Sequence, residues 1–362
     1  MNRIIEFLVC CMFFQHIALS QIPANDPHWK LDWQDDFNTF NNLRWSKGNY
    51  GIQDKDAKCL YMAQNVWTAN GNLVIEMNNT KTKCPIEPQP WPGAPVANCI
   101  NGNDYDYTSG IVATLDNVQF GYIESRIKAP FKKGWNLCSA FWTFIGWNVP
   151  PPKNAAEIDI FEMFGERYKE PNTINTCIHR YYNCTNLNNP LCDPKLAKLD
   201  RGLGISHEFS NFDYTDWHIY AIEWNADRII WYVDGKVIRT MSDHKIINPV
   251  MIILSNAMDK KPSPSFSEKM LVDYVKVYKL KCDKEETPVN EISNFNTYNY
   301  TVKKSITMSN ATTIPANSNI TLRATDFIEL KPGFEVQTGR ELYLDVTPCD
   351  NSLTGTPPPE ED

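Results

Sequence analysis

Residues 157–162, with the sequence E-I-D-I-F-E, place three carboxylates inside an apolar, β-branched run. Such a run predicts a β-strand, along which Glu157 and Asp159 share one face because side chains alternate. Plain alternation would turn Glu162 into the core, where an unpaired carboxylate is costly. One β-bulge near Phe161 brings Glu162 back to the face of the other two acids. We therefore expect a row of three acids on one wall of a sheet.

Paired carboxylates on one wall suit the hydrolysis of a glycosidic bond, in which one acid protonates the leaving group and another attacks. An arbitrary motif of this spacing is more often a solvated surface strand, but these acids interrupt a strand of buried type. Aromatic rings, whose faces pack against the C–H faces of sugars, crowd the neighbouring sequence: Trp135, Phe141, Trp142, Phe144, Trp147, Phe161 and Phe164. The surroundings thus favour a carbohydrate-active site.

Other segments complete a recognisable order along the chain. They are Y-T-S-G at 107–110, G-Y-I-E-S-R-I-K at 121–128, A-F-W at 140–142, W-H-I-Y-A-I-E-W at 217–224, W-Y-V-D-G at 231–235 and V-D-Y-V-K-V-Y at 272–278. With the acidic motif, this set resembles glycoside hydrolase family 16 in its bulged form, laminarinase- or agarase-like. The resemblance spans about residues 28 to 280.

The fold class expected is all-β. Short strand-like segments separated by turn signals, without long helical periodicity, predict a sandwich of two antiparallel sheets. The resemblance implies that the sandwich is a concanavalin-like jelly roll with the substrate cleft on its concave sheet. Asp234-Gly235 predicts a hairpin turn within it.

By the family's pattern, Glu157 is the nucleophile, Glu162 the general acid/base and Asp159 an assisting acid. The implied activity is that of a glycosidase that hydrolyses O-glycosyl bonds inside a β-linked polysaccharide and retains the anomeric configuration. Like charges this close cannot both ionise comfortably, so one acid is expected to hold a proton near neutral pH. The three carboxyls should titrate together.

Substrate binding is expected from Trp142, Trp135 and His179. Trp142 shares a strand face with Ala140, whereas Trp135 follows a glycine and belongs at the rim of the cleft. If the face of His179 is the cleft face, its ring reaches the sugar or Asp159. Core packing is the alternative for each of these side chains.

No cofactor is required for this chemistry. Relatives in the family often hold a structural calcium ion on the convex side, and the matching positions here are Asp36, the backbone of Gly71, and Asp273. Hard oxygen ligands of this kind suit calcium. Asp36 stands where relatives often carry glutamate, so its reach is shorter, and simple surface acids are the alternative.

The chain divides into five parts. Residues 1–20 read as a secretory signal, 21–282 as the catalytic domain, 283–290 as a charged linker, 291–349 as a small β module and 350–362 as a disordered acidic tail. The module resembles C-terminal modules of secreted proteins from Bacteroidetes-type bacteria. It is expected to act as a spacer, with surface retention and weak glycan binding as alternatives, and to be dispensable for catalysis. The protein is then secreted or held at the cell surface, as a monomer.

Secretion permits disulfides. Cys84 with Cys99 and Cys184 with Cys192 bracket Pro- and Asn-rich loops and are the favoured pairs, while the remaining mature cysteines cannot be paired from sequence. No C-x-x-C pair suggests a zinc site. No run after the signal is long enough to span a bilayer.

Net charge is −8, and without an evident basic patch the chain is not expected to bind nucleic acid. The substrate expected is a polysaccharide, with β-1,3- or mixed-linkage glucan favoured. Ile111 stands where laminarinase-like chains often carry Arg, and Leu137-Cys138-Ser139 precede Ala140 where such chains often carry Trp-Pro. A galactan hydrolase of agarase or carrageenase type stays open, because Arg167, Lys169 and Arg180 lie near the motif. A non-catalytic carbohydrate-binding sandwich is a further alternative.

Overall fold

A computed structural model provides the structure of the protein. It describes residues 28–52, 59–85, 97–131, 137–144, 154–165, 170–182, 203–226, 228–242, 244, 246, 249–258, 267–282, 301–308, 319–336, 338 and 341–346. Several sequence expectations fall on other residues: the signal, the linker, the acidic tail, Trp135 and the pair Cys184–Cys192.

Two sheets form the sandwich, and one of them has seven antiparallel strands. In spatial order the strands of this seven-stranded sheet are β16 (Ile205–Glu208), β15 (Thr173–Tyr182), β14 (Asn154–Phe164), β13 (Leu137–Phe144), β20 (Met251–Met258), β11 (Ile111–Thr114) and β2 (Trp45–Lys47). The acidic motif lies in β14, which therefore has strands bonded to it on both sides.

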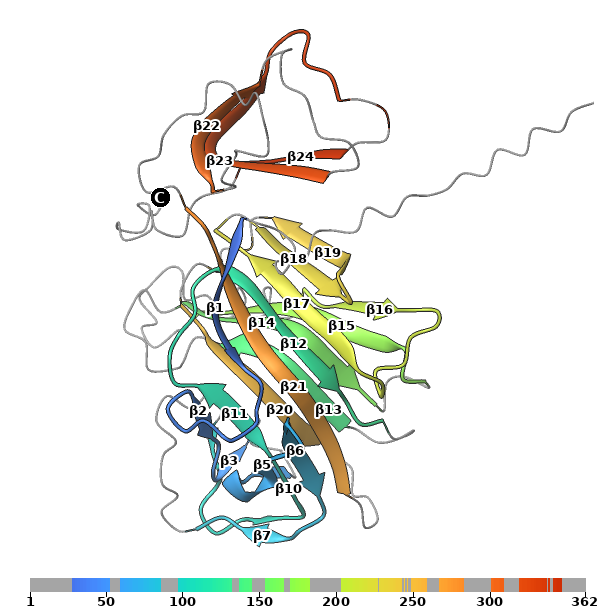
Figure 1. The fold of residues 1–362 in the computed structure, drawn as a ribbon. Helices are drawn as coiled ribbons and strands as arrows, with labels where there is room; N and C mark the ends of the chain where they lie inside the picture. The colour runs from blue at the N-terminus through green and yellow to red at the C-terminus, as the bar shows by residue number, and fades with distance from the viewer. Residues whose placement is uncertain are drawn as a thin grey trace, which may run out of the picture.

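The second sheet has twelve strands. Its path runs β19 (Lys236–Ser242), β18 (Arg228–Val233), β17 (His218–Trp224), β12 (Gly121–Lys128), β21 (Ser267–Leu280), β6 (Asn72–Asn78), β10 (Tyr107–Ser109), β4 (Cys59–Tyr61), β3 (Gly51–Ile52) and β8 (Ala97–Asn98), while β1 (Trp29–Asp35) pairs with β21 and β5 (Val66–Ala69) with β6. Figure 1 shows the two sheets as stacked layers, with β12 and β21 in front of β13 and β20.

The remaining elements of the sandwich are short. They are β7 (Thr82–Lys83), which pairs with β9 (Asp104–Tyr105), and a 3-10 turn, η1 (Ala63–Asn65). Within the described residues the protein is thus all-β, as the sequence predicted, and no helix there has the length and apolar character needed to cross a bilayer.

The core lies between the two sheets, where alternate side chains of both layers meet. Ile158 and Phe161 of β14 are fully buried, and the Phe161 ring lies 4.2 Å from that of Tyr220 in β17, centroid to centroid. Burying a large apolar side chain stabilises a fold by about 1.5–3 kcal/mol. The apolar positions of β14 therefore fix which face of the strand turns inward, and the acids take the other face.

A buried polar cluster ties the sheets together beside this core. The Ser109 hydroxyl in β10 donates to the backbone carbonyl of Asn256 in β20, and the Ser139 hydroxyl donates to the Asn256 side chain at 3.0 Å. Next to it, a Cβ on Gly110 would lie 2.6 Å from a Val66 methyl group. The Y-T-S-G segment is thus explained by close packing of the sheets, since only glycine fits there.

The turn between β18 and β19 matches its sequence prediction. Asp234 and Gly235 have φ angles of 48° and 74°, as a two-residue hairpin turn requires. The Asp234 carboxylate accepts from the backbone N–H of Ile219 at 2.9 Å and lies 2.7 Å from His218 Nδ1. His218 Nε2 lies 3.0 Å from the carbonyl of Asp213. Both ring nitrogens therefore face acceptors, which favours the imidazolium form.

The pH dependence of stability follows from this pair. Burial opposes charge on both groups, but the hydrogen bond with Asp234 raises the pKa of His218, and that with His218 lowers the pKa of Asp234. The contribution of His218 is complete below about pH 6.5 and is lost as pH rises through its raised folded pKa. That of Asp234 is present above about pH 3.9 and is lost as pH falls through its lowered folded pKa.

We expect Asp234→Asn to lower the melting temperature most between about pH 4.5 and 6, with a smaller loss at about pH 9 where His218 is neutral. Asparagine still tolerates the positive φ and still accepts from Ile219, so the substitution isolates the charge. Thermal unfolding across pH measures the effect, with Asp116→Asn, an exposed acid after β11, as the control. A loss independent of pH would contradict the ion pair.

A third sheet follows the sandwich in the chain. It consists of three parallel strands, β22 (Lys303–Met308), β23 (Asn319–Leu330) and β24 (Glu341–Val346). Its own small core is built from Ile306, Met308, Ile320, Leu322 and Ala324. These strands lie within the β module expected at 291–349, and in Figure 1 they form the orange and red layer at one end of the molecule.

A partly buried network of four charges joins this module to the twelve-stranded sheet. Arg323 Nη1 lies 2.7 Å from Asp345 Oδ2 and 3.3 Å from Glu223 Oε1 of β17. Arg228 Nη2 of β18 lies 2.6 Å from Asp345 Oδ1 and 3.6 Å from Glu223 Oε1. Two cations and two anions therefore balance, which is the condition under which buried charges are tolerated. The module is docked on the sandwich through these pairs.

Arg323→Met is expected to lower the free energy of unfolding by up to about 3 kcal/mol, because it leaves Glu223 and Asp345 with one cation between them. Arg323→Lys keeps the charge without the fork and should lose less. The fold of the acidic motif at low temperature should survive both changes, since the network lies on the twelve-stranded sheet and the motif lies in the seven-stranded one. Chemical denaturation measures the loss, and a wild-type midpoint for Arg323→Met would contradict the docking.

Candidate active site

The pairing of β14 changes register within the acidic motif. On the β13 side Trp142 faces Asp159 but Phe141 faces Phe161, so one residue is extra. On the β15 side Asp159 faces Cys177 and Glu162 faces Asn175, which sets three steps on β14 against two on β15. The β-bulge expected near Phe161 is confirmed.

The bulge leaves the three acids together on the sheet face opposite the core. Glu157 faces His179 across the β14–β15 ladder, while Ile158 and Phe161 point into the core. The side chain of Glu157 is 15% exposed and that of Asp159 only 2%. The outer two acids are thus partly open to solvent and the middle one is enclosed.

Burial has a direct electrostatic effect on Asp159. Desolvation and the charge of Glu162 raise the pKa of Asp159 well above its usual value, although a hydrogen bond with Glu157 and the charge of Arg239 act in the opposite direction. A raised pKa favours the protonated form, which can donate a hydrogen bond to an ionised Glu157. The environment therefore favours different protonation states for Asp159 and Glu157.

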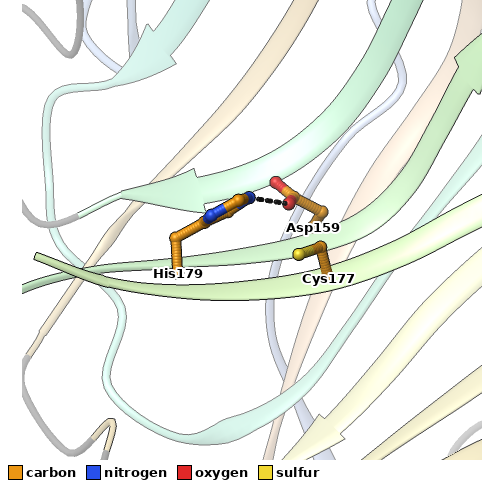
Figure 2. A group of neighbouring side chains, drawn as sticks. All are labelled: Asp159, Cys177 and His179. Carbon is orange, nitrogen blue, oxygen red and sulfur yellow. Dashed lines mark ion pairs between the residues drawn. The ribbon is translucent and has the colours of Figure 1, made fainter. Parts of the chain in front are cut away.

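His179 lies against this pair of acids. Its Nε2 is 3.3 Å from Asp159 Oδ2 and 3.9 Å from Glu157 Oε1, and its side chain is 25% exposed (Figure 2). The ring is thus partly exposed and within reach of Asp159, as the sequence expected. Its part in sugar binding stays a prediction.

Trp142 lies on the same face, opposite Asp159 in the β13–β14 ladder. It is partly buried, and its Nε1 donates to Ser255 Oγ at 3.1 Å. The ring makes an edge contact with Phe144, with centroids 6.0 Å apart. Stacking on a sugar stays a prediction for this tryptophan.

Two residues of the other sheet support the acidic strand, and sequence reasoning gave neither of them this part. Trp231 of β18 is fully buried, and its indole N–H donates to the backbone carbonyl of Asp159 at 2.9 Å. Arg239 of β19 donates to the carbonyls of Thr176 at 2.9 Å and Leu203 at 2.7 Å. A carbonyl at a bulge is at risk of losing its ladder partner, and Trp231 satisfies it.

Among the described residues, some cysteines form disulfides and others do not. Cys84 and Cys99 form the expected disulfide, and Cys282 is also disulfide-bonded. Cys59, Cys138 and Cys177 are buried thiols outside the disulfides. Cys177 faces Asp159 directly, and burial, followed by the charges of Asp159, Glu162 and Glu157, raises the pKa of its thiol.

The positions expected for calcium already have other polar partners. The Asp273 carboxylate binds the Arg126 guanidinium at 2.8 Å, and Asp36 Oδ2 accepts from Gln34 at 3.0 Å. Gly71 lies close to Asn38, whose Oδ1 would be 3.8 Å from an added Cβ. A calcium ion at Asp273 would compete with a fixed cation, so these residues fit the ion poorly and calcium stays a prediction.

Comparison with known proteins places this site in a family. The model of Glycosyl hydrolases family 16 matches residues 53–276, more than half of the chain. The chain therefore belongs to glycosyl hydrolase family 16, as its motifs indicated.

Individual relatives are more distant. Endo-1,3-1,4-beta-glycanase EglC of Rhizobium meliloti (strain 1021) is 27% identical over 306 residues, covering 77% of this chain and 58% of EglC. The chain thus spans little more than half of that relative. The Beta-glucanase of Rhodothermus marinus is 24% identical over 311 residues, covering 77% of this chain and 95% of that protein.

Solved structures share the sandwich. The endo-beta-1,3-glucanase from Pyrococcus furiosus has a TM-score of 0.51 and 28% identity, covering 70% of this chain and 95% of that one. The jelly-roll fold expected from the sequence is confirmed by this likeness.

We expect Trp231→Phe to lower kcat by up to about 100-fold, because small misplacement of catalytic groups has effects of that size, while the unsatisfied Asp159 carbonyl destabilises the fold by about 1–3 kcal/mol. Trp224→Phe is the matched control. Trp224 lies in the adjacent β17, and its buried indole N–H likewise donates to a backbone carbonyl, that of Ile246. This substitution should destabilise similarly and leave kcat intact. Equal kcat losses in both variants would show that Trp231 acts through stability alone.

Proposed function

We propose that this chain is a secreted, endo-acting, retaining glycosidase that cleaves β-1,3- or mixed-linkage glucan by double displacement. The observation that carries the proposal is the bulge in β14, which gathers Glu157, Asp159 and Glu162 on one open sheet face. Family membership and the β-glucanase names of the relatives support the choice of reaction and substrate. Secretion rests on the signal-like residues 1–20.

In the first half of the reaction the Glu157 carboxylate attacks the anomeric carbon while Glu162 gives its proton to the glycosidic oxygen. The glycosidic bond breaks, and a glycosyl ester on Glu157 forms. In the second half Glu162 takes a proton from water, which attacks the same carbon and releases Glu157. Two inversions retain the configuration.

Asp159 acts through Glu157 in this scheme. In its protonated form it donates to Glu157, which keeps the nucleophile ionised and oriented. Once Glu157 becomes an ester, its negative charge is gone and Asp159 ionises more easily. The partly exposed Trp142 stacks on the sugar bound beside them in this proposal.

The substrate is tested by a reducing-end assay of the full chain on laminarin, lichenan, agar and carrageenan. We expect activity on the first two that changes little with added salt, because neutral sugars bind without ion pairs. Proton NMR of the first product should show the β anomer. Strong activity on the galactans alone would overturn the glucan assignment, and an initial α anomer would overturn retention.

Substitution of the two outer acids separates their roles. Glu157→Gln should abolish turnover and formation of the glycosyl-enzyme. Glu162→Gln should lower kcat on polysaccharide by about 10²–10⁴-fold but much less on a substrate with an activated leaving group, which needs little protonation. Glu208→Gln, an exposed acid on edge strand β16, is the control for loss of charge. Near-normal activity in both active-site variants would exclude this pair as the catalytic machinery.

A further inference from the structure

We propose that Asp159, Cys177 and His179 form a binding site for a thiophilic divalent cation of the zinc type, and that its occupancy inhibits the glycosidase. Binding stands on geometry alone, whereas inhibition rests on the proposed function. One ligand atom from each side chain lies within 4.8 Å of the other two. Figure 2 shows the three side chains converging from β14 and β15.

The strand register explains why these residues meet. Asp159 is the direct cross-strand partner of Cys177, and His179 follows two residues later on the same face. These residues lie on two neighbouring strands in the interior of the seven-stranded sheet, so the backbone at all three positions is held by strands on both sides. A zinc ion with bonds of about 2.0–2.3 Å draws its ligands to within about 4 Å of one another. Side-chain rotations that move the ligand atoms by about an ångström therefore suffice to bring them to zinc-binding distances.

The ligand atoms are available for such an ion. Asp159 Oδ2 is buried and has no hydrogen-bond partner among the described residues, although it lies 3.3 Å from His179 Nε2. The Cys177 thiol is free of any disulfide, and its hydrogen bond is a long one of 3.5 Å to the neighbouring carbonyl of Ile178. An unsatisfied buried oxygen costs free energy, and a cation would remove that penalty.

The donor set selects the class of cation. Sulfur, imidazole nitrogen and a carboxylate oxygen together suit zinc and similar borderline-soft ions, whereas calcium and magnesium prefer oxygen ligands throughout. On binding, bonds from zinc to the Cys177 sulfur and to an Asp159 oxygen form, the S–H bond of Cys177 and the O–H bond of protonated Asp159 break, and both protons leave to solvent. Because the side chain of His179 is 25% exposed and lies 3.9 Å from Glu157 Oε1, water or Glu157 would complete the coordination.

Occupancy and catalysis exclude each other at this position. A cation held by Asp159 takes the carboxyl that otherwise donates to Glu157, and it places positive charge beside the proposed nucleophile. His179 Nε2 is only 3.9 Å from Glu157 Oε1, so the ion also stands where the sugar must approach. Inhibition should therefore compete with substrate and be reversed by a chelator.

The experiment pairs a spectroscopic readout with an activity readout on the full chain. Cobalt(II) replaces zinc as the probe, because a thiolate ligand gives it a charge-transfer band in the near ultraviolet. We expect that band in the wild type and in Cys138→Ser, the control for another buried cysteine of the same sheet, and no band in Cys177→Ser. Cys177→Ala is the second variant if the serine variant fails to fold.

In the activity arm, zinc should inhibit the wild type and Cys138→Ser, with recovery in EDTA, while calcium at equal concentration should not. The zinc concentration for half-inhibition should rise at least about tenfold in Cys177→Ser, since even changes outside the ligand shell weaken metal binding about 10–100-fold. A cobalt band in a chain inactive on every glycan would sink the proposed function but not the site. Absence of the wild-type band, or equal zinc inhibition in Cys177→Ser, would overturn the site.

Discussion

The extra residue in β14 is the constraint on which the active site depends. A regular strand would send either Glu162 or its apolar neighbours to the wrong side of the sheet, because side chains alternate with a period of two. The bulge resolves this conflict, but it disturbs the ladder on both sides of Asp159. The carbonyl of Asp159 is then satisfied from the other sheet, by the indole of Trp231. Packing of the two sheets thus holds the geometry of the acids.

Burial of Asp159, the middle acid, determines both its protonation and the ligand atoms around it. Partly open acids on either side can exchange protons with substrate and water, while buried Asp159 is biased toward its protonated form. The same burial leaves one of its oxygens without a hydrogen-bond partner among the described residues and places a thiol and an imidazole beside it. The burial that raises the pKa of Asp159 therefore also gathers the ligand atoms that a borderline-soft cation prefers.

The module of parallel strands β22–β24 contacts the sandwich through ion pairs. Its Arg323 and Asp345 interlock with Glu223 and Arg228 of the twelve-stranded sheet. That sheet also supplies Trp231 and Arg239, which support the strands of the acidic motif from behind. The role of the module as a spacer stays a prediction, and the paired charges account for its docking on the sheet.

Local pattern alone determined a good part of this protein. The E-I-D-I-F-E run predicted both a strand and its bulge, since no other arrangement keeps three carboxylates out of an apolar core, and Asp234-Gly235 predicted its own turn. The pair Cys84–Cys99 was also correct, because the two cysteines close one short loop. Each of these features is decided by residues near one another in the chain.

Tertiary structure decided the rest. Cys177 has no C-x-x-C partner, so its convergence with Asp159 and His179 followed only from the register of β14 on β15. The support from Trp231 and Arg239 crosses from one sheet to the other, and the docking of Arg323 joins residues 100 positions apart. Such contacts depend on which strands become neighbours. That choice is made by burial summed over the whole core, and no single segment of the sequence contains it.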